Sequence, residues 1–320
     1  MKDNFMPSTP LTTPILFMVF NRPDTTQKVF NTIRQAKPKK LFIAADGPRP
    51  GKEGELEKCK KVREIAASVD WDCEVKMLFR DKNLGCKIAI SYAIDWFFEN
   101  TEEGIIREDD YLPSQSFFWF CQELLKKYRD VKNIGIISGS NYFFGEKDTE
   151  EDYYFSVFPF IWGWASWKHV WKQYDIKMID WPIFKKNKGF HDLFCSNACI
   201  EYWERSFDQT YNAIIDTWDY QFTFMLCNNH FLNISPTLNL ISNIGVGDDA
   251  SHTKGKKSKH ANMPRYELRL PLIHQENILR SLRLDKKFEK QAFHKNVLKK
   301  TLSRLKLWLV KFIVIIKESF

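Results

Sequence analysis

The sequence lacks the glycine-rich loops by which many α/β enzymes hold phosphates. No GxGxxG follows the first expected strand, and GxxxxGK[ST] occurs nowhere in the 320 residues. Such loops present backbone N–H groups to a phosphate at the start of a helix. Their absence excludes a dinucleotide fingerprint and a P-loop. A phosphate-bearing ligand would then need another source of positive charge, such as a metal ion held on acidic side chains.

Paired cysteines and long apolar runs are also missing. The seven cysteines are odd in number and irregularly spaced, which favours the reducing cytoplasm. The opening MKDNFMPSTPLTTP has an acid and prolines where a signal peptide would be apolar. No apolar stretch reaches the length of a membrane span. The sequence therefore predicts a cytoplasmic protein.

Charge is distributed unevenly along the chain. Residues 254–320 contain 18 Lys/Arg and 5 Asp/Glu, whereas residues 1–253 contain 30 and 35. A basic end attracts an anionic partner. No nucleic-acid-binding motif accompanies the charge, so nucleic acid is disfavoured. The last residues place Leu302, Leu305, Leu309, Phe312 and Ile316 on one face of an expected helix. This pattern predicts a peripheral contact with the anionic inner face of the cell membrane, with a docked helix or a dimer contact as alternatives.

Apolar runs alternate with helical patterns through the first half of the chain. A run such as ILFMVF at 15–20 fits a strand buried on both faces, and Asp24 with Gln27 predicts a capping box for the next helix. Strands are expected at 15–20, 41–47, 74–79, 104–106 and 134–139. Helices are expected from Asp24, at 54–69, from Gly85 to about Phe98, at 114–129 with Ser114 as cap, at 196–213 and at 217–229. The alternation predicts a Rossmann-like α/β sheet.

Polar residues follow four of these strands. Ligands of open α/β sheets bind beyond the carboxyl ends of the strands, so we expect the four polar ends to meet at one crevice. They are Asn21-Arg22, Asp46-Gly47, Arg80-Asp81-Lys82-Asn83 and Glu108-Asp109-Asp110.

The acidic triplet Glu108-Asp109-Asp110 is the candidate metal site. Neighbours in an extended strand point to opposite faces, so all three cannot ligate one ion. We expect Asp110 to bind Mn²⁺ or Mg²⁺ and one of the others to face a ribose or a structural donor. A solvated acidic turn, or a helix cap at Asp110, is the alternative.

Seven motifs, in order, resemble a bacterial family of nucleotide-diphospho-sugar transferases, some of whose members carry a hemolysin-like label. The likeness covers about residues 14–253, and the EDD-then-FF element is more distantly similar to Golgi N-acetylglucosaminyltransferases. The motifs are FNRPDTT, AADGPR, DKNLGC, EDDYLPSQSFF, IWGWASWKHVW, DTWDYQ and IGVGDDASHT. The resemblance implies a GT-A glycosyltransferase fold and an inverting, metal-dependent reaction.

The resemblance also implies roles at matching positions. Asn21 and Arg22 would meet the nucleotide, and Asp46 would read the base or ribose edge. The donor's ribose and phosphates would lie near Lys82, Asn83 and Gly85, and Asp110 matches the DxD-type metal ligand. Arg107 departs from the apolar residue expected before the triplet: it would pair with a phosphate if it faces the site, or need a carboxylate partner if it faces the sheet.

Asp219 is the candidate catalytic base. Inverting transfer needs one group that removes the proton of the acceptor hydroxyl, and a carboxylate suits this role. The alternative is structural: Thr217 caps a helix and Asp219 complements its dipole. Asp216 is the second candidate.

Two further groups complete the expected site. Trp162, Gly163 and Trp164 would form the wall on the acceptor side, with Gly163 allowing a close backbone approach and Trp167 and Trp171 left to the core. His252 would complete the metal shell or touch the diphosphate, although a solvated loop histidine is the plainer reading. The following KGKKSK could close over an anionic donor.

Taken together, these features predict a GT-A type, Rossmann-like mixed sheet flanked by helices at residues 1–253. A basic loop and C-terminal helical extension would follow at 254–320. The expected activity is transfer of a sugar from a nucleotide-sugar donor to a glycan or lipid-linked glycan acceptor. A sugar-nucleotide nucleotidyltransferase and a non-catalytic membrane-associated protein are the alternatives.

Overall fold

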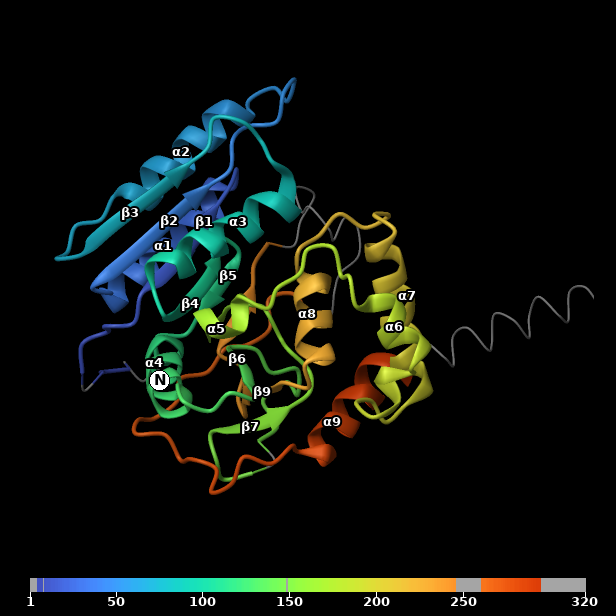
Figure 1. Ribbon diagram of the computed structural model, residues 1–320. Helices are drawn as coiled ribbons and strands as arrows, with labels where there is room; N and C mark the ends of the chain where they lie inside the picture. Colours follow the sequence, from blue (N-terminus) through green and yellow to red (C-terminus); the bar gives the residue numbers. More distant parts are fainter. Residues whose placement is uncertain (1–4, 8, 148, 246–259, 295–320) are drawn as a thin grey trace, which may run out of the picture.

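A computed structural model describes residues 5–7, 9–147, 149–245 and 260–294. Its centre is an eight-stranded mixed sheet in the order β3-β2-β1-β4-β8-β6-β9-β7 (Figure 1). The strands are β1 (Ile15–Val19), β2 (Lys40–Ala45), β3 (Glu74–Phe79), β4 (Glu103–Glu108), β6 (Ile134–Ser138), β7 (Tyr153–Ser156), β8 (Trp164–Trp167) and β9 (Leu232–Pro236). The expected α/β class with a mixed sheet flanked by helices is confirmed.

The first four strands of this order run parallel, as alternation of strands and helices dictates. β1 pairs in parallel with β2 on one side and β4 on the other, and β2 pairs in parallel with β3. β8 then enters antiparallel to both β4 and β6. Every residue of β1 is buried, as the unbroken apolar run predicts for a central strand covered on both faces.

The helices of the first half agree with the expected ranges, but two of their caps do not. α1 is Pro23–Ala36, α2 is Glu55–Ala67, α3 is Gly85–Asn100 and α4 is Ser116–Tyr128. α1 begins at a proline after Arg22, without a side-chain cap, so the expected box at Asp24 and Gln27 is wrong. Proline at the first helical position has no N–H to satisfy and a φ suited to a helix. Gln27 instead donates to Asn31 at 2.9 Å.

The start of α4 is capped from a distant part of the chain. Ser114 does not cap it; the backbone N–H groups of Gln115 and Ser116 donate to the carboxylate of Glu267 at 2.9 and 2.7 Å. Leu268 and Leu272 lie in the main core beside this contact. The described residues 260–294 therefore continue the packed fold beyond residue 253.

Alternation along β4 gives its two faces different neighbours. A Cβ on Gly104 would meet the Phe97 ring of α3, while the guanidinium of Arg107 lies 5.2 Å from the Phe117 ring of α4. α3 and α4 thus cover opposite faces of β4. Glu108, in phase with Gly104, belongs to the face that α3 covers.

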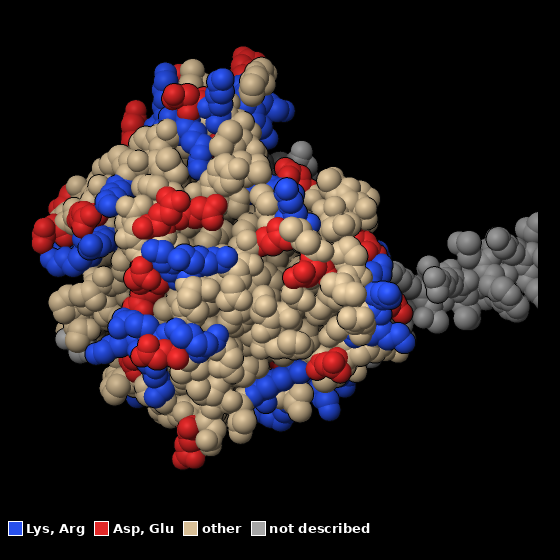
Figure 2. Space-filling model, in the orientation of Figure 1, with Lys and Arg blue, Asp and Glu red and all other residues tan. Residues whose placement is uncertain are grey.

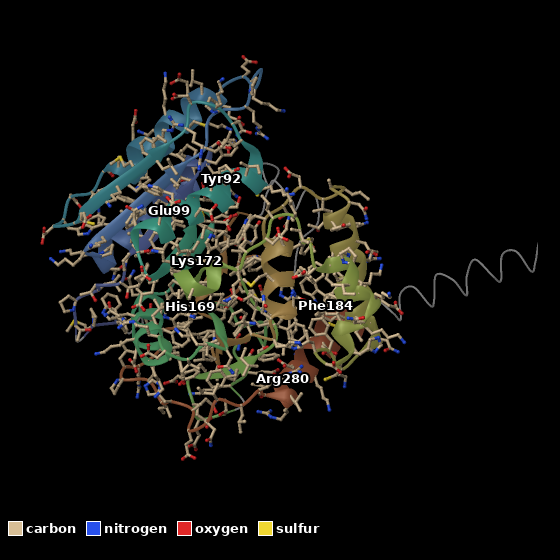
Figure 3. The ribbon with its side chains drawn as sticks, viewed as in Figure 1. Tyr92, Glu99, His169, Lys172, Phe184 and Arg280 are labelled. Atoms are coloured by element: carbon tan, nitrogen blue, oxygen red, sulfur yellow. The ribbon has the colours of Figure 1, made fainter. Side chains whose placement is uncertain are left out.

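A second apolar cluster lies beside the sheet, around the aromatic side chains of three helices, α6 (Trp181–Lys186), α7 (Asn197–Tyr211) and α8 (Asp219–Asn228). In Figure 1 these helices stand together on the side away from α2 and β3. Phe184 points from α6 toward this cluster (Figure 3) and lies 5.4 Å from the Phe224 ring. The helices of the second half are α5 (Lys168–Trp171), α6 (Trp181–Lys186), α7 (Asn197–Tyr211), α8 (Asp219–Asn228) and α9 (Leu282–Glu289).

A small antiparallel sheet supports the chain that follows the acidic triplet. It pairs β5 (Tyr111–Pro113) with β10 (Ile241–Asn243). Among the described residues, no helix has the length and apolarity to cross a bilayer. The seven cysteines, all within this part of the chain, are free thiols.

Candidate functional site

The acidic triplet marks the carboxyl end of β4, and its three side chains have different surroundings. Asp109 is buried and accepts hydrogen bonds from Phe20 N and the Thr26 hydroxyl, both at 3.3 Å. Burial raises the pKa of Asp109 to about 6, although Arg22 acts in the opposite direction. Glu108 is half-buried and makes no hydrogen bond to a described residue. Burial, followed by the charge of Asp110, raises the pKa of Glu108 well above its usual value.

Arg22 joins the end of β1 to the triplet. One guanidinium nitrogen lies 2.7 Å from Asp109 Oδ1 and another lies 2.8 Å from Asp110 Oδ2. Gly245 packs over this pair so closely that a Cβ there would lie 2.1 Å from Asp110 Oδ2. Arg22 therefore lies beside the acidic triplet with the two aspartates as its described partners, and its expected contact with the nucleotide stays a prediction.

Asp110 has one oxygen left over. Its Oδ1 is buried and has no hydrogen-bond partner among the described residues. A buried orphan acceptor of this kind fits a cation, since a bare carboxylate oxygen is costly to bury. Within the described chain, no three His, Cys, Asp or Glu side chains form a metal-binding group. Asp110 is thus the described residue that would hold a divalent ion, and such an ion would supply positive charge at this edge of the sheet.

Asp46, at the end of β2, organises the loop before α3. Its carboxylate accepts from Gly47 N at 3.0 Å, from the Asn83 amide at 2.9 Å and from the backbone N–H groups of Leu84 and Gly85. Asn83 also donates to Gly47 O at 2.8 Å. The Lys82 side chain is exposed. The structure thus brings the expected loop residues together and gives Asp46 a positioning contact.

Asn21 is held by a residue that the sequence reasoning missed. Glu55, buried at the start of α2, accepts from the Asn21 amide at 2.9 Å and from Arg49 N at 2.7 Å. Hydrogen bonding from Arg49 lowers the pKa of Glu55 to about 2. An acid in the first turn of a helix is an ordinary partner of the helix dipole, so its position alone gave no reason to select Glu55.

Asp219 is the first residue of α8, and one of its oxygens stabilises the helix start. Oδ1 accepts from the Thr217 hydroxyl and from Tyr220 N at 3.0 Å. Asp219 thus lies at the helix start, as the structural alternative has it, but Thr217 donates to this carboxylate and does not cap the helix. Oδ2 makes no hydrogen bond to a described residue. The charge of Asp219 also acts on Glu108 and Tyr111, so the carboxylate lies near the end of β4. Asp216 lies on the same side, with its Oδ2 3.7 Å from the place of a Cβ on Gly85.

The aromatic segment divides between a wall and the core. Trp162 is half-buried and stacks on Tyr111, with ring centroids 5.8 Å apart. Trp164 is a core residue stacked on Trp218, so it has no free face for a sugar and does not belong to the wall. Trp167 and Trp171 lie in the core as expected. Of the two tryptophans expected on the acceptor side, Trp162 remains.

Gly163 leaves the space that the buried side chain of Arg107 occupies. Gly163 has φ of 70°, and a Cβ there would lie 2.0 Å from a guanidinium nitrogen of Arg107. Arg107 is 0% exposed, and none of its three nitrogens has a hydrogen-bond partner among the described residues. Both expectations for this residue, a phosphate at the site or a carboxylate partner, are therefore wrong: it lies in the core over an aromatic ring.

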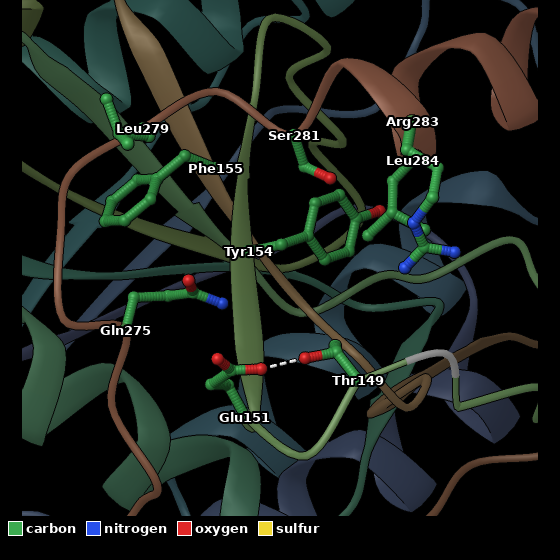
Figure 4. A pocket seen from close by; sticks show the side chains of 9 residues that line it. All are labelled: Thr149, Glu151, Tyr154, Phe155, Gln275, Leu279, Ser281, Arg283 and Leu284. Atoms are coloured by element: carbon green, nitrogen blue, oxygen red, sulfur yellow. Dashed lines mark hydrogen bonds between the residues drawn. The ribbon is translucent and has the colours of Figure 1, made fainter.

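Several expected features lie outside the described residues. They are His252 as a metal ligand, the KGKKSK segment and the helical face from Leu302 to Ile316. A pocket of about 250 Å³ lies elsewhere, between β7 and the segment 275–284 (Figure 4). β8, β6 and β9 separate it from β4, so it is not part of the acidic site.

Comparison with known proteins gives no family assignment. No family model matches the sequence, and no curated protein matches it. Among solved structures, apo UDP-glucose pyrophosphorylase is similar at 11% identity and a TM-score of 0.37, over 72% of this chain and 93% of that one. HddC from Yersinia pseudotuberculosis is similar at 8% identity and a TM-score of 0.30, over 51% of this chain and 80% of that one. 4-Diphosphocytidyl-2C-methyl-D-erythritol synthase from Anaerococcus prevotii is similar at 8% identity and a TM-score of 0.32, over 55% of this chain and 84% of that one. TM-scores this low do not establish a shared activity.

Proposed function

We propose that this protein is an inverting glycosyltransferase that uses a nucleotide-diphospho-sugar donor, with its site at the carboxyl ends of β1, β2 and β4. The observation that carries the proposal is the buried, unbonded Oδ1 of Asp110 at the end of β4, with the carboxylate of Asp219 nearby. Open α/β sheets bind ligands at this edge. Mn²⁺ or Mg²⁺ bound at Asp110 would offset the charge of the leaving nucleotide diphosphate.

Several residues of the chain would each have a separate role in this transfer. Asp219 accepts the proton of the acceptor hydroxyl through its free Oδ2 as that oxygen attacks the anomeric carbon. The bond between the anomeric carbon and the diphosphate oxygen breaks on the opposite face, and the configuration inverts. Trp162 and Tyr111 provide an aromatic surface for a sugar ring. Asp46, Asn83 and Glu55 keep the donor-side loops in place.

Donor titration tests the proposal. The full chain is heated with UDP-, GDP- and CMP-sugars, each with and without Mn²⁺. We expect one donor to raise the unfolding temperature only when Mn²⁺ is present, and Asp110→Ala to abolish this shift. If no donor gives a metal-dependent shift, the proposal is wrong. Pyrophosphate release from a nucleoside triphosphate and a sugar phosphate would show a nucleotidyltransferase instead.

Asp219 has a matched pair of variants that separates catalysis from helix capping. Asn keeps an oxygen that can accept from Thr217 and Tyr220 but cannot take a proton at neutral pH. We expect Asp219→Asn to keep the donor-induced shift and the unfolding temperature while losing transfer by about 100-fold or more. Asp219→Ala should lose transfer and also some stability. Full transfer by Asp219→Asn would leave Asp219 a structural residue.

The acceptor belongs to the same proposal. We infer a surface-glycan precursor on a lipid carrier, because residues 295–320 combine seven Lys/Arg and one acid with many apolar side chains. A protein with this composition would work at the cytoplasmic face of an anionic membrane.

A further inference from the structure

The segment that leads into α9, in the last described part of the chain, exposes several aliphatic side chains. The loop before α9 exposes Ile278 and Leu279, and the first residue of α9 exposes Leu282. Leu279 is 71% exposed and Leu282 is 51% exposed. Contiguous exposed apolar surface is the feature by which protein and membrane interaction sites are recognised. We call these three residues the apolar tip.

The apolar tip is held in place by the fold. Arg280 forms a bridge with Phe155 of β7, and Ser281 N donates to Phe155 O at 2.8 Å. The Arg280 side chain, labelled in Figure 3, donates to Asp285 at 2.6 Å and to Leu193 O at 2.5 Å. Leu279 also forms one side of the pocket in Figure 4. The contacts of Arg280 and Ser281 therefore hold the backbone of the apolar tip in a position that leaves its side chains exposed.

Charge on α9 is sorted between its two faces. Both acids between residues 277 and 290, Asp285 and Glu289, are buried. Asp285 pairs with Arg280, and Glu289 accepts from Cys195 N at 2.9 Å. Lys286 and Lys290 are exposed and pair with no acid in the described chain. Figure 2 shows Lys and Arg side chains over the position of α9. The outward face of α9 thus carries cations beside the apolar tip, and the exposed acid Glu146 is paired with Lys287.

We propose that the apolar tip and the outward cations of α9 form a docking surface for an anionic lipid membrane. Aliphatic side chains that enter the acyl boundary, flanked by cations at the level of the phosphates, are the pattern that binds such an interface. In the sequence, α9 is followed closely by residues 295–320, whose composition is basic and apolar, and we expect both to meet the same membrane. The inference rests on the membrane location proposed above, but its test is independent of donor binding.

The test is vesicle sedimentation with the full chain. Vesicles of phosphatidylcholine with phosphatidylglycerol are compared with vesicles of phosphatidylcholine alone. We expect Leu279→Ser/Leu282→Ser to weaken binding to the anionic vesicles about tenfold. Ile179→Ser/Ile183→Ser is the matched control, because these side chains are 70% and 53% exposed but lie at α6. Circular dichroism and the donor-induced thermal shift should stay unchanged in both pairs.

Charge reversal gives the second arm. Lys286→Glu/Lys290→Glu should weaken binding to anionic vesicles and make that binding less dependent on salt. Lys58→Glu/Lys126→Glu makes the same change of charge on α2 and α4, and we expect it to weaken vesicle binding less. Equal losses in the test and control pairs, or no loss in either, would overturn the proposal. A change in sedimentation coefficient without vesicles, caused by the Leu279→Ser/Leu282→Ser pair, would assign the surface to a second copy of the chain and also overturn it.

Discussion

At the scale of single residues, Arg107 is a costly side chain to bury in the core. A buried guanidinium without hydrogen bonds loses its hydration and gains only contact with the Phe117 ring. We expect Arg107→Met, which keeps much of the apolar stem, to raise the free energy of unfolding by about 1 to 3 kcal/mol in urea denaturation. Arg129→Met, which removes an exposed pair with Glu103, should cost at most about 1 kcal/mol. A destabilised Arg107→Met would contradict this reading.

The buried guanidinium of Arg107 should also make the free energy of unfolding depend on pH. Burial lowers the pKa of Arg107 to about 9, from an ordinary value of 12.5. Between these two values the unfolded chain holds a proton that the folded chain has released, so the contribution of Arg107 to stability rises with pH. The difference in unfolding free energy between Arg107→Met and the natural chain should therefore be largest below pH 9 and narrow above it. A constant difference between pH 7 and pH 10.5 would show that the guanidinium keeps its proton in the folded state.

The order of strands and helices predicted which polar strand ends lie at one edge of the sheet, but not how their side chains pair. Strand-end positions could be predicted because parallel topology brings those ends to one edge of the sheet. The contact of Arg22 with both aspartates could not, because it depends on the path of α1. The division between Trp162 and Trp164 could not be predicted, because Trp162 lies before β8 and Gly163, with φ of 70°, interrupts the extended backbone that would place residues two apart on one face.

At the scale of elements, the start of α4 is the clearest case of a long-range cap. Glu267→Ala leaves the N–H groups of Gln115 and Ser116 without their acceptor, and we expect a loss of about 1 to 2 kcal/mol in urea denaturation. Glu267→Gln keeps one acceptor oxygen and should cost less. Glu276→Ala, an exposed change nearby, serves as the control. An equal effect of all three changes would contradict the capping role.

Element boundaries could be predicted to within a few residues, whereas caps could not. Local patterns gave α4 as 114–129 and the structure has Ser116–Tyr128. The cap was misassigned because its true partner lies 152 positions away, beyond any local window. At α1 the local pattern of a capping box was present, but the N-cap is Arg22 and the helix begins at Pro23, two residues earlier than a cap at Asp24 would place it.

At the scale of the whole molecule, the described part of the C-terminal region shares the main core. Leu268 and Leu272 are buried among side chains of the sheet and of α4. We expect Leu268→Ala to cost about 2 to 5 kcal/mol, as much as Leu125→Ala within α4. Both variants should unfold in one transition with an unchanged urea m-value. A separate, earlier transition in Leu268→Ala would show that this segment unfolds on its own.

The contacts that residues 113–116, just after the acidic triplet, make with the C-terminal region can form only late in synthesis. The Pro113 carbonyl and the N–H groups after it are bonded by Arg265 and Glu267. A nascent chain that has emerged through Phe118 already carries the whole triplet, yet it lacks both of these partners. The loop therefore acquires these contacts only after residue 267 has been synthesised, and a ribosome stalled before residue 260 would display the acids without them.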